Sequence, residues 1–420
     1  MRPLTYSIIT LNRNYSKKCH SKLGNTSLIL NDVFTHEMSD YFLNPKVDGA
    51  IMDRFIRYYV GRVDPINNPE IVDYYIEKNS KGRFFLRGSS CDELIKEASE
   101  IKKWGSKLDF LNVPLSDCTN FNELFSIDIT DILPAKIFNF GYRFFQQDMA
   151  NCHGTTLNLL GFTDNILYGS NASIFSVANS PICRELENNE KTEASDIILF
   201  QKRCSTKKCV DDLPMMSSKN YMLSEIYHSG TFLSPRFIYQ KRSFFYEDAP
   251  VFTNYKYARN TTFQDQSASN GYHKIPKKCQ NRKMIKNKKE LLTLIESGDE
   301  CQYFTSTIRC QPIEQFLKSL KENGDYLRSI FLQAREYMKQ LGEMYYQDSE
   351  MIYSDILSKK RKFISDQLRR LKDSVEDIIL ELEYDIETTN KNIFTWRILL
   401  NMINDGLVGT KPQRRPKTKN

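Results

Sequence analysis

The sequence predicts an α+β fold, in which a short helix precedes antiparallel strands and further helices lie on both sides of this central part. The short helix is predicted to begin at Cys152, because Asn151 is a typical N-cap, apolar residues follow, and Gly161 is a typical stop. Apolar runs bounded by turn residues predict strands at 195–200, 226–233 and 236–241. With 420 residues, of which 40% are hydrophobic and 12% aromatic, the chain has room for a large core and two or three domains.

Changes of pattern along the chain divide it into five segments. Residues 1–126 are predicted to be mainly helical, since apolar residues recur at helical spacing at 51–59, 71–75 and 91–104, with one strand-like stretch at 83–86. The central α+β domain is predicted at 127–260, and a basic linker with a candidate hairpin follows at 261–311. A helical hairpin is predicted at 312–405 and a disordered basic tail at 406–420.

Two apolar stripes predict the helices of the C-terminal segment. One runs from Phe316 to Tyr345 and the other from Ile364 to Leu382, and both step by three and four residues. The break at 347–350 favours a hairpin whose stripes pack on each other, although one long interrupted helix also fits. A coiled coil with a protein partner is the alternative use of these stripes.

Charge, histidine content and hydropathy exclude several classes of function. The 59 basic and 52 acidic residues leave a net charge of +7, which is ordinary for solubility, so we expect no nucleic-acid partner. The five histidines are scattered and no CxxC pair occurs, so we expect no metal site and no cofactor. No run of about eighteen apolar residues occurs, so no integral membrane segment is expected.

Ten cysteines leave the redox compartment open. Cys204 and Cys209 are five residues apart and Cys301 and Cys310 are nine apart, so either pair can close a loop. The apolar run at 1–11 is too short and too polar for a clear signal peptide.

Three residues of the central domain form a candidate catalytic triad. Cys152 lies in the first turn of its helix, where unpaired backbone N–H groups and the helix dipole stabilise a thiolate. His228 is the candidate base, and a hairpin around Ser234-Pro235 would bring Gln240 beside it, so that the amide orients the imidazole. Each residue also has a structural interpretation. Cys152 can be a small buried hydrophobic residue, His228 a structural histidine, and Gln240 an exposed strand residue.

Three short motifs carry this triad. They read Asn-Cys-His-Gly at 151–154, Ser-Asp-Ile-Ile-Leu-Phe at 195–200 and His-Ser-Gly-Thr-Phe-Leu at 228–233. They resemble the Asp-Cys-Ser-Gly, Gly-Asp-Leu-Val-x-Phe and His-Val-Gly-Ile-Tyr-Leu segments of the NlpC-type cysteine peptidases, papain-like amidohydrolases that cut cell-wall peptides. The resemblance covers about a third of the chain, from 138 to 257.

The resemblance implies a papain-like core in which the nucleophile helix packs on an antiparallel sheet. It implies Cys152 as nucleophile, His228 as general base and acid, Gln240 as orienting group, and an oxyanion hole built partly from the Cys152 backbone N–H. It also implies a cell-envelope, periplasmic or secreted location.

Several positions depart from the family pattern. Asn151 replaces the usual Asp, His153 replaces the usual Ser, and an insert with Cys204 and Cys209 separates the second and third motifs. Tyr142 is the candidate for the family's aromatic residue upstream of the nucleophile. We expect His153 to be an exposed first-turn residue rather than a second base.

The first functional hypothesis is a thiol peptidase or amidase that cleaves an amide, with peptidoglycan as a candidate substrate. The second is an inactive papain-fold scaffold of the cell envelope, with the helical hairpin as its surface for a protein partner. A thiol acyltransferase would use the same three residues and stays a third alternative.

Overall fold

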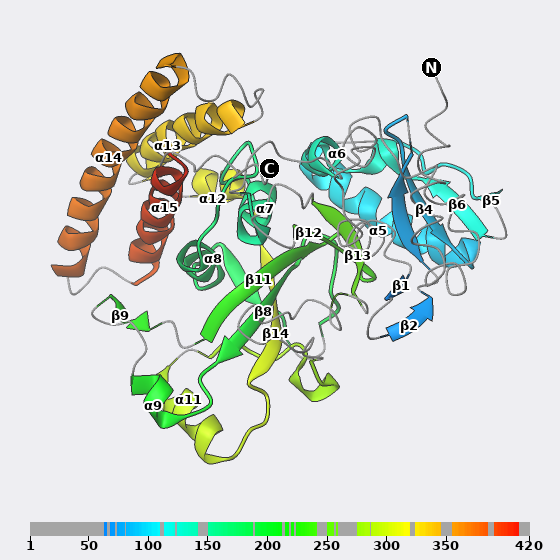
Figure 1. Ribbon diagram of the computed structural model, residues 1–420, viewed down its shortest axis with the longest axis horizontal. Coiled ribbons are helices and arrows are strands. Elements are labelled where there is room, and N and C mark those ends of the chain that lie inside the picture. The colour runs from blue at the N-terminus through cyan, green and yellow to red at the C-terminus, as the bar shows by residue number, and fades with distance from the viewer. Residues whose placement is uncertain are drawn as a thin grey trace, which may run out of the picture.

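The protein, described here from a computed structural model, has an α+β architecture with antiparallel sheets and a helical C-terminal region, which confirms the predicted class (Figure 1). The structure describes residues 63–64, 68–71, 74–79, 81–109, 113–121, 124–141, 150–187, 190–211, 215–217, 220–221, 224–241, 250–255, 258, 275–285, 287–319, 324–345, 355–384 and 390–410. The helix predicted at 51–59, Tyr142 and the tail beyond 410 lie outside these residues.

The N-terminal part of the described chain is a four-stranded antiparallel sheet on which one helix packs. The strand order is β3-β4-β6-β5, with bounds Tyr75–Lys78, Phe84–Gly88, Leu124–Asp128 and Thr119–Phe121. Phe84 and Leu86 of β4 are buried against the apolar face of α5 (Cys91–Asp109). The prediction of a mainly helical region therefore does not describe these residues, because Tyr75 begins a strand that pairs with β4. Short apolar runs do not separate a helix from a strand by period alone.

A six-stranded antiparallel sheet forms the centre of the molecule. Its order is β13-β12-β11-β8-β14-β7, with bounds Val251–Asn254, Phe237–Gln240, Ser224–Phe232, Ile197–Arg203, Tyr303–Cys310 and Cys183–Glu185. The apolar run of β8 is buried because the strand lies inside the sheet and is covered on both faces. The strands predicted at 195–200, 226–233 and 236–241 correspond to β8, β11 and β12.

Strand β14 corrects the interpretation of 261–311 as a linker with a hairpin. It lies between β8 and β7, with Ile308 opposite both Ile197 and Glu185. It is also preceded by helix α11 (Lys288–Glu296). The partners of β14 lie more than a hundred residues earlier in the chain, and local sequence does not encode such pairing.

Four disulfides join eight of the nine cysteines that the structure describes. The pairs are Cys91–Cys118, Cys183–Cys310, Cys204–Cys209 and Cys279–Cys301. The predicted Cys204–Cys209 loop is confirmed. The predicted Cys301–Cys310 pair is wrong, because Cys310 faces Cys183 across the β14–β7 ladder.

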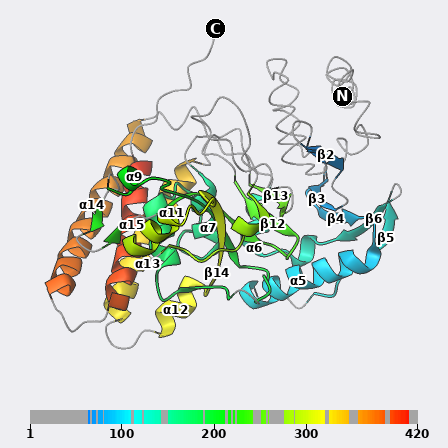
Figure 2. The ribbon, with the colours of Figure 1, turned by 90° about the horizontal axis from the view of Figure 1, so that it is seen from below.

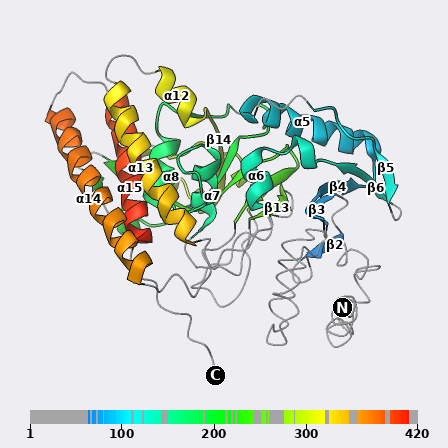
Figure 3. The ribbon, with the colours of Figure 1, turned by 90° about the horizontal axis from the view of Figure 1, so that it is seen from above.

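Three long helices, rather than a two-helix hairpin, form the C-terminal region (Figure 3). They are α13 (Gly324–Tyr345), α14 (Asp355–Tyr384) and α15 (Asn390–Gly409). The first predicted stripe begins at Phe316 on α12 (Ile313–Ser319) and continues along α13, and the second lies on α14. Helix α15 was missed, and it extends into the segment that was predicted to be a disordered tail. Residues 406–410 are ordered because they pack on α13 and α14: a side chain on Gly406 would contact Met338 and Leu368.

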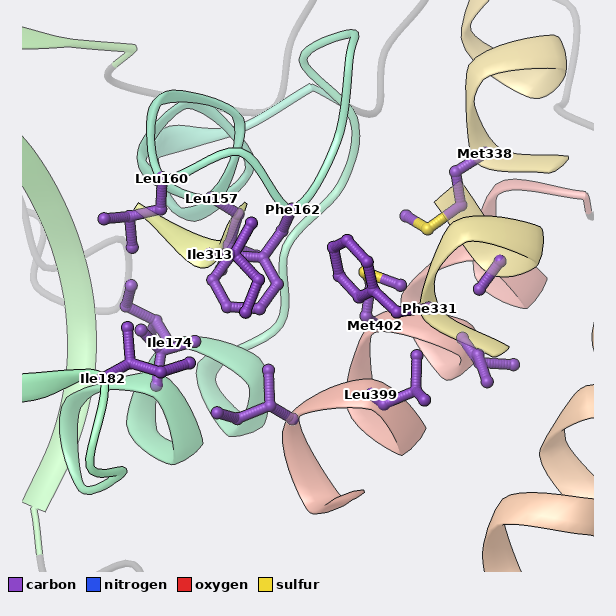
Figure 4. Close-up of a cluster of buried hydrophobic side chains, with 14 of the residues drawn as sticks. Leu157, Leu160, Phe162, Ile174, Ile182, Ile313, Phe331, Met338, Leu399 and Met402 are labelled. Carbon is purple, nitrogen blue, oxygen red and sulfur yellow. The ribbon is translucent and has the colours of Figure 1, made fainter. Parts of the chain in front are cut away.

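The central domain and the C-terminal helices share one hydrophobic core (Figure 4). Leu157 of α7 (Cys152–Leu159) and Ile174 of α8 (Asn171–Ala178) lie in the same cluster as Phe331 and Leu399. The central domain and the C-terminal helices were predicted as separate domains, but the two segments are not separate in their hydrophobic cores. The stripes of α13 and α14 are covered within the chain, as the self-packing alternative required.

The N-terminal sheet and the C-terminal helices flank the central sheet on opposite sides (Figures 1 and 2). The remaining elements are short: β1 (Val63–Asp64), β2 (Asn68–Ile71), η2 (Thr130–Ile132), α6 (Ala135–Phe140), α9 (Lys207–Asp211), β9 (Met215–Ser217), β10 (Asn220–Tyr221), η3 (Lys277–Cys279) and α12 (Ile313–Ser319). Among the described residues, no helix combines the length and apolarity needed to span a membrane.

Candidate active site

Asn151 fixes the N-terminus of helix α7, as predicted. Its Oδ1 accepts from the backbone N–H of Gly154 at 2.8 Å and of Gly169 at 3.0 Å, and its Nδ2 donates to the Gly169 carbonyl at 2.8 Å. An aspartate could accept these bonds but could not donate the third. The amide at this position therefore ties helix α7 to the segment at 167–169.

Gly154 lets α7 and this segment approach closely. An added Cβ would lie 1.6 Å from the Leu167 carbonyl oxygen, so the backbone would have to move. We expect Gly154→Ala to lower the free energy of unfolding by about 3 kcal/mol, measured by denaturant titration. The control is Gly298→Ala, at φ 69° with open space around it, where only the left-handed backbone is penalised, by about 1 kcal/mol. Equal losses would contradict the close approach.

Cys152 is the one cysteine in the described part of the chain that is not in a disulfide. It is the first residue of α7 and only 7% exposed. Burial opposes ionisation of the thiol, but the charges of His153 and His228 and hydrogen bonds from both imidazoles outweigh it. The pKa of Cys152 therefore lies well below its usual value.

His228 and Gln240 meet as the predicted hairpin requires. Strands β11 and β12 pair with Thr231 opposite Tyr239, which brings Gln240 back toward His228. Nε2 of His228 lies 2.6 Å from Gln240 Oε1, and Gln240 Nε2 donates to Thr253 Oγ1 at 3.0 Å. Because Oε1 can only accept, Nε2 carries a proton and Nδ1 is left to interact with Cys152.

His153 is buried, so the expectation of an exposed first-turn residue is wrong. It is 3% exposed, and its ring lies between Ser229 of β11 and Asn171 of α8. Burial disfavours the charged ring, but the charge of Cys152 and the hydrogen bonds that the ring donates to Cys152 and Asn171 raise the pKa of His153 above its ordinary value. All eight residues of α7 are buried. Its sequence, Cys-His-Gly-Thr-Thr-Leu-Asn-Leu, has no Lys, Arg, Asp or Glu, and this was the available signal for a helix without a solvent face.

Asp405 of α15 joins this region from the C-terminal helices, and sequence reasoning missed it. Its Oδ2 accepts from the backbone N–H of Ser170 at 3.0 Å and from the hydroxyl of Ser173, at the start of α8. Burial raises the pKa of Asp405 to about 6, and the Ser173 and Ser170 hydrogen bonds and the charge of His153 reduce that rise. Burial and the charges of Asp405 and Cys152 also raise the pKa of Tyr168.

The second motif plays a structural role. Ser195 has a φ of 79°, a conformation that favours glycine, and its N–H donates to the Phe232 carbonyl at 2.7 Å. The buried carboxylate of Asp196 accepts two bonds from Arg309, from Nε at 2.7 Å and from Nη2 at 2.9 Å. These contacts hold the entry to β8 against β11 and β14.

A cleft of about 750 Å³ lies elsewhere in the molecule, between α5 and the segment at 191–195. Trp104, Glu97 and Arg309 are among its lining residues, and none of the predicted triad is. The candidate site is therefore the buried group of side chains around Cys152, which lies outside this cleft.

The described residues contain no group of three or more His, Cys, Asp or Glu side chains that could hold a metal ion. Comparison with known proteins found no family model, no curated protein and no solved structure that matches the chain.

Proposed function

We propose that the chain is a cysteine hydrolase that cleaves an amide bond, with Cys152 as nucleophile, His228 as general base and acid, and Gln240 as orienting residue. The observation that carries the proposal is the position of the His228 ring, whose charge and hydrogen bonding lower the pKa of the Cys152 thiol and whose Nε2 lies 2.6 Å from Gln240 Oε1. These side chains come from a helix and two strands, and their sequence of donors and acceptors is that of a nucleophile, a base and an orienting group.

The proposed reaction follows from these contacts. The thiol proton moves to Nδ1 of His228, and the thiolate attacks the amide carbonyl carbon. The carbonyl electron pair moves to oxygen, near the backbone N–H of Cys152 at the start of α7, which has no intrahelical partner. When the C–N bond breaks, Nδ1 protonates the leaving nitrogen. A water molecule then gives a proton to Nδ1 and attacks the thioester, which releases the acid and restores the thiolate.

We propose further that the central domain is a papain-like core of the NlpC type. The order of nucleophile helix, entry strand, histidine strand and orienting strand supports this, and so does Ser195. It occupies the position of the family's glycine and has the left-handed backbone that glycine favours. A cell-wall peptide is the substrate class that this resemblance suggests.

The four disulfides support a location in an oxidising compartment, where such bonds persist. We therefore propose a secreted or cell-envelope protein, in line with the proposed substrate class. An enzyme of this kind would meet peptidoglycan outside the reducing interior of the cell.

One observation favours the alternative of an inactive binding or scaffold protein. Cys152, His228 and Gln240 are 7%, 3% and 1% exposed, so the described residues leave little of the triad open to a substrate. An acyltransferase would share the same first half-reaction and differ only in the acceptor of the acyl group.

The pH dependence of alkylation tests the proposed nucleophile. An ordinary thiol, with a pKa near 8.5, alkylates more than a hundredfold faster at pH 8.5 than at pH 6, because only about 0.3% is thiolate at the lower pH. The lowered pKa of Cys152 keeps the thiolate present at pH 6, so its rate with iodoacetamide should change little over this range. The ratio of the alkylation rates at the two pH values, taken at one residue, does not depend on how accessible the thiol is to iodoacetamide. It is measured by mass spectrometry of the Cys152 peptide.

The matched comparison is the same cysteine in protein unfolded in urea with its disulfides intact, where the steep profile should return. The Cys152→Ala variant identifies any label carried by the one cysteine that lies outside the described residues. A folded protein whose Cys152 shows the steep profile would favour the scaffold alternative.

A further inference from the structure

A second imidazole lies beside the Cys152 thiol and is held by its own set of partners. The Nδ1 of His153 lies 2.9 Å from Ser229 Oγ, and its Nε2 lies 2.9 Å from Asn171 Oδ1. Ser229 Oγ in turn lies 3.0 Å from Thr156 Oγ1, which lies 3.2 Å from the Cys152 carbonyl oxygen. His153, Ser229 and Thr156 are each at most 3% exposed, so solvent does not compete for these bonds.

The direction of these hydrogen bonds follows from their last acceptor. The Cys152 carbonyl can only accept, so the hydroxyl of Thr156 donates to it. Thr156 Oγ1 has then used its proton and accepts from Ser229, whose proton is used in the same way. Ser229 Oγ must therefore accept from Nδ1–H of His153.

The opposite side of the ring imposes the same requirement. Asn171 Oδ1 can only accept, so Nε2 of His153 carries a proton as well. A neutral imidazole has one N–H, and only the imidazolium has two. The two sets of partners are therefore satisfied together only by the cation.

We propose that His153 is held as an imidazolium and is the fixed counter-ion of the Cys152 thiolate, while His228 alone exchanges the proton. This inference rests on the proposed role of Cys152 as nucleophile and adds a residue that the triad does not contain. In the proposed reaction, the proton that leaves sulfur goes to Nδ1 of His228, and both protons of His153 stay in place. Charge is therefore conserved in the step, and the thiolate forms between two cations.

The difference between the two rings comes from their partners. His228 meets one acceptor, Gln240 Oε1, whose orientation is set by the bond from Gln240 Nε2 to Thr253 Oγ1. Its other nitrogen, Nδ1, is the one that exchanges the proton in the proposed reaction. His153 meets an acceptor at each nitrogen, so losing either proton would leave one of two buried hydrogen bonds unmade.

The titratable groups around the pair of His153 and Cys152 come from four parts of the fold. Cys152 adjoins it on α7, His228 lies on β11, Asp405 lies on α15 and Tyr168 lies in the segment before α8. Cys152 and Asp405 carry negative charge when ionised and favour the cation, whereas a protonated His228 disfavours it. The raised pKa of His153 agrees with the proposal, because the anion at Cys152 and the bonds to Cys152 and Asn171 act against burial.

The charge of His153 is measured directly in the unmodified protein. Two-dimensional ¹⁵N–¹H spectra of ¹⁵N-histidine-labelled protein distinguish a ring with two protonated nitrogens from one with a bare nitrogen. At pH 7.5 the His153 ring is expected to show two protonated nitrogens, with its signals assigned by their loss in His153→Gln. A bare nitrogen at this pH would overturn the proposal, whether or not any variant folds.

The effect on the thiol is measured with His153→Gln, which removes the charge and keeps a polar side chain. We expect the apparent pKa of Cys152 to rise by at least about one unit, measured as a shift of the pH at which the rate of alkylation by iodoacetamide is half its maximum. Ser229→Ala removes the acceptor at Nδ1 with a smaller change of volume, and its His153 is expected to lose one proton at lower pH than in the unmodified protein. An unchanged alkylation profile in His153→Gln would mean that His153 only fills space.

These readouts separate this inference from the proposed function. A protein with a doubly protonated His153 and a shifted thiol profile, but no hydrolysis, would keep the inferred counter-ion and reject the hydrolase. A protein that hydrolyses the amide but has a neutral His153 would keep the proposed hydrolase and reject the inferred counter-ion.

Discussion

Replacing Cys152 with alanine is expected to reduce amide hydrolysis by a factor on the order of a millionfold, with the fold retained. No other described cysteine has a free thiol, so no second thiol among the described residues can take over the attack. The loss of Sγ removes a small volume from the start of α7, where Asn151 and Gly154 set the backbone without using the thiol. The measurement is the release of amine from a peptide substrate, with the unfolding curve recorded for both proteins.

The matched control is Thr155→Ser, on the same helix. Thr155 is as buried as its neighbours, and its hydroxyl donates to the Asn151 carbonyl at 2.9 Å, which serine can also do. This variant should keep its activity, so that a loss in Cys152→Ala cannot be assigned to disturbance of α7. Hydrolysis by Cys152→Ala at the rate of the control would end the hydrolase proposal.

The start of α7 and the contact between His228 and Gln240 could be predicted because each depends on a local pattern. An N-cap followed by apolar residues sets the start of α7, and a turn at Ser234-Pro235 sets the register that returns Gln240 to His228. Both rules act over fewer than about fifteen residues. Whether these side chains perform catalysis is a separate question, which the variant above addresses.

The surroundings of the triad could not be predicted in the same way. The partners of His153 are Asn171 and Ser229, which are 18 and 76 residues away, and Asp405 reaches Ser173 across 232 residues. No periodicity links such positions. The expectation of an exposed His153 came from the usual exposure of a first helical turn, which fails when a helix is covered on every side.

The fold shows the same division between local and distant information. The stripes on α13 and α14 were visible because helical period is a property of neighbouring residues. The place of β14 inside the central sheet, and the core that α15 shares with α7 and α8, depend on contacts between distant segments. The segment near Cys301 was therefore assigned to a local hairpin, although its partners are β8 and β7.

Removing the Cys183–Cys310 disulfide is expected to lower the free energy of unfolding by about 5 kcal/mol, the largest effect on stability that we predict. The bond closes a loop across 127 residues, so it restricts the unfolded chain strongly. In the folded protein it joins register partners at the end of β14, where Cys310 is buried in the core that also contains α7. The measurement is the denaturant midpoint and slope for Cys183→Ala/Cys310→Ala against the unmodified protein.

The matched control is the Cys204→Ala/Cys209→Ala pair, whose loop spans only five residues. The same chain-entropy relation gives about 2 kcal/mol for it, so the two double variants should differ by about 3 kcal/mol. Both remove two sulfurs, which leaves loop length as the principal difference between them. Equal losses would mean that the stabilisation comes from local packing around the sulfurs, and β14 would then be held in the central sheet mainly by its pairing with β8.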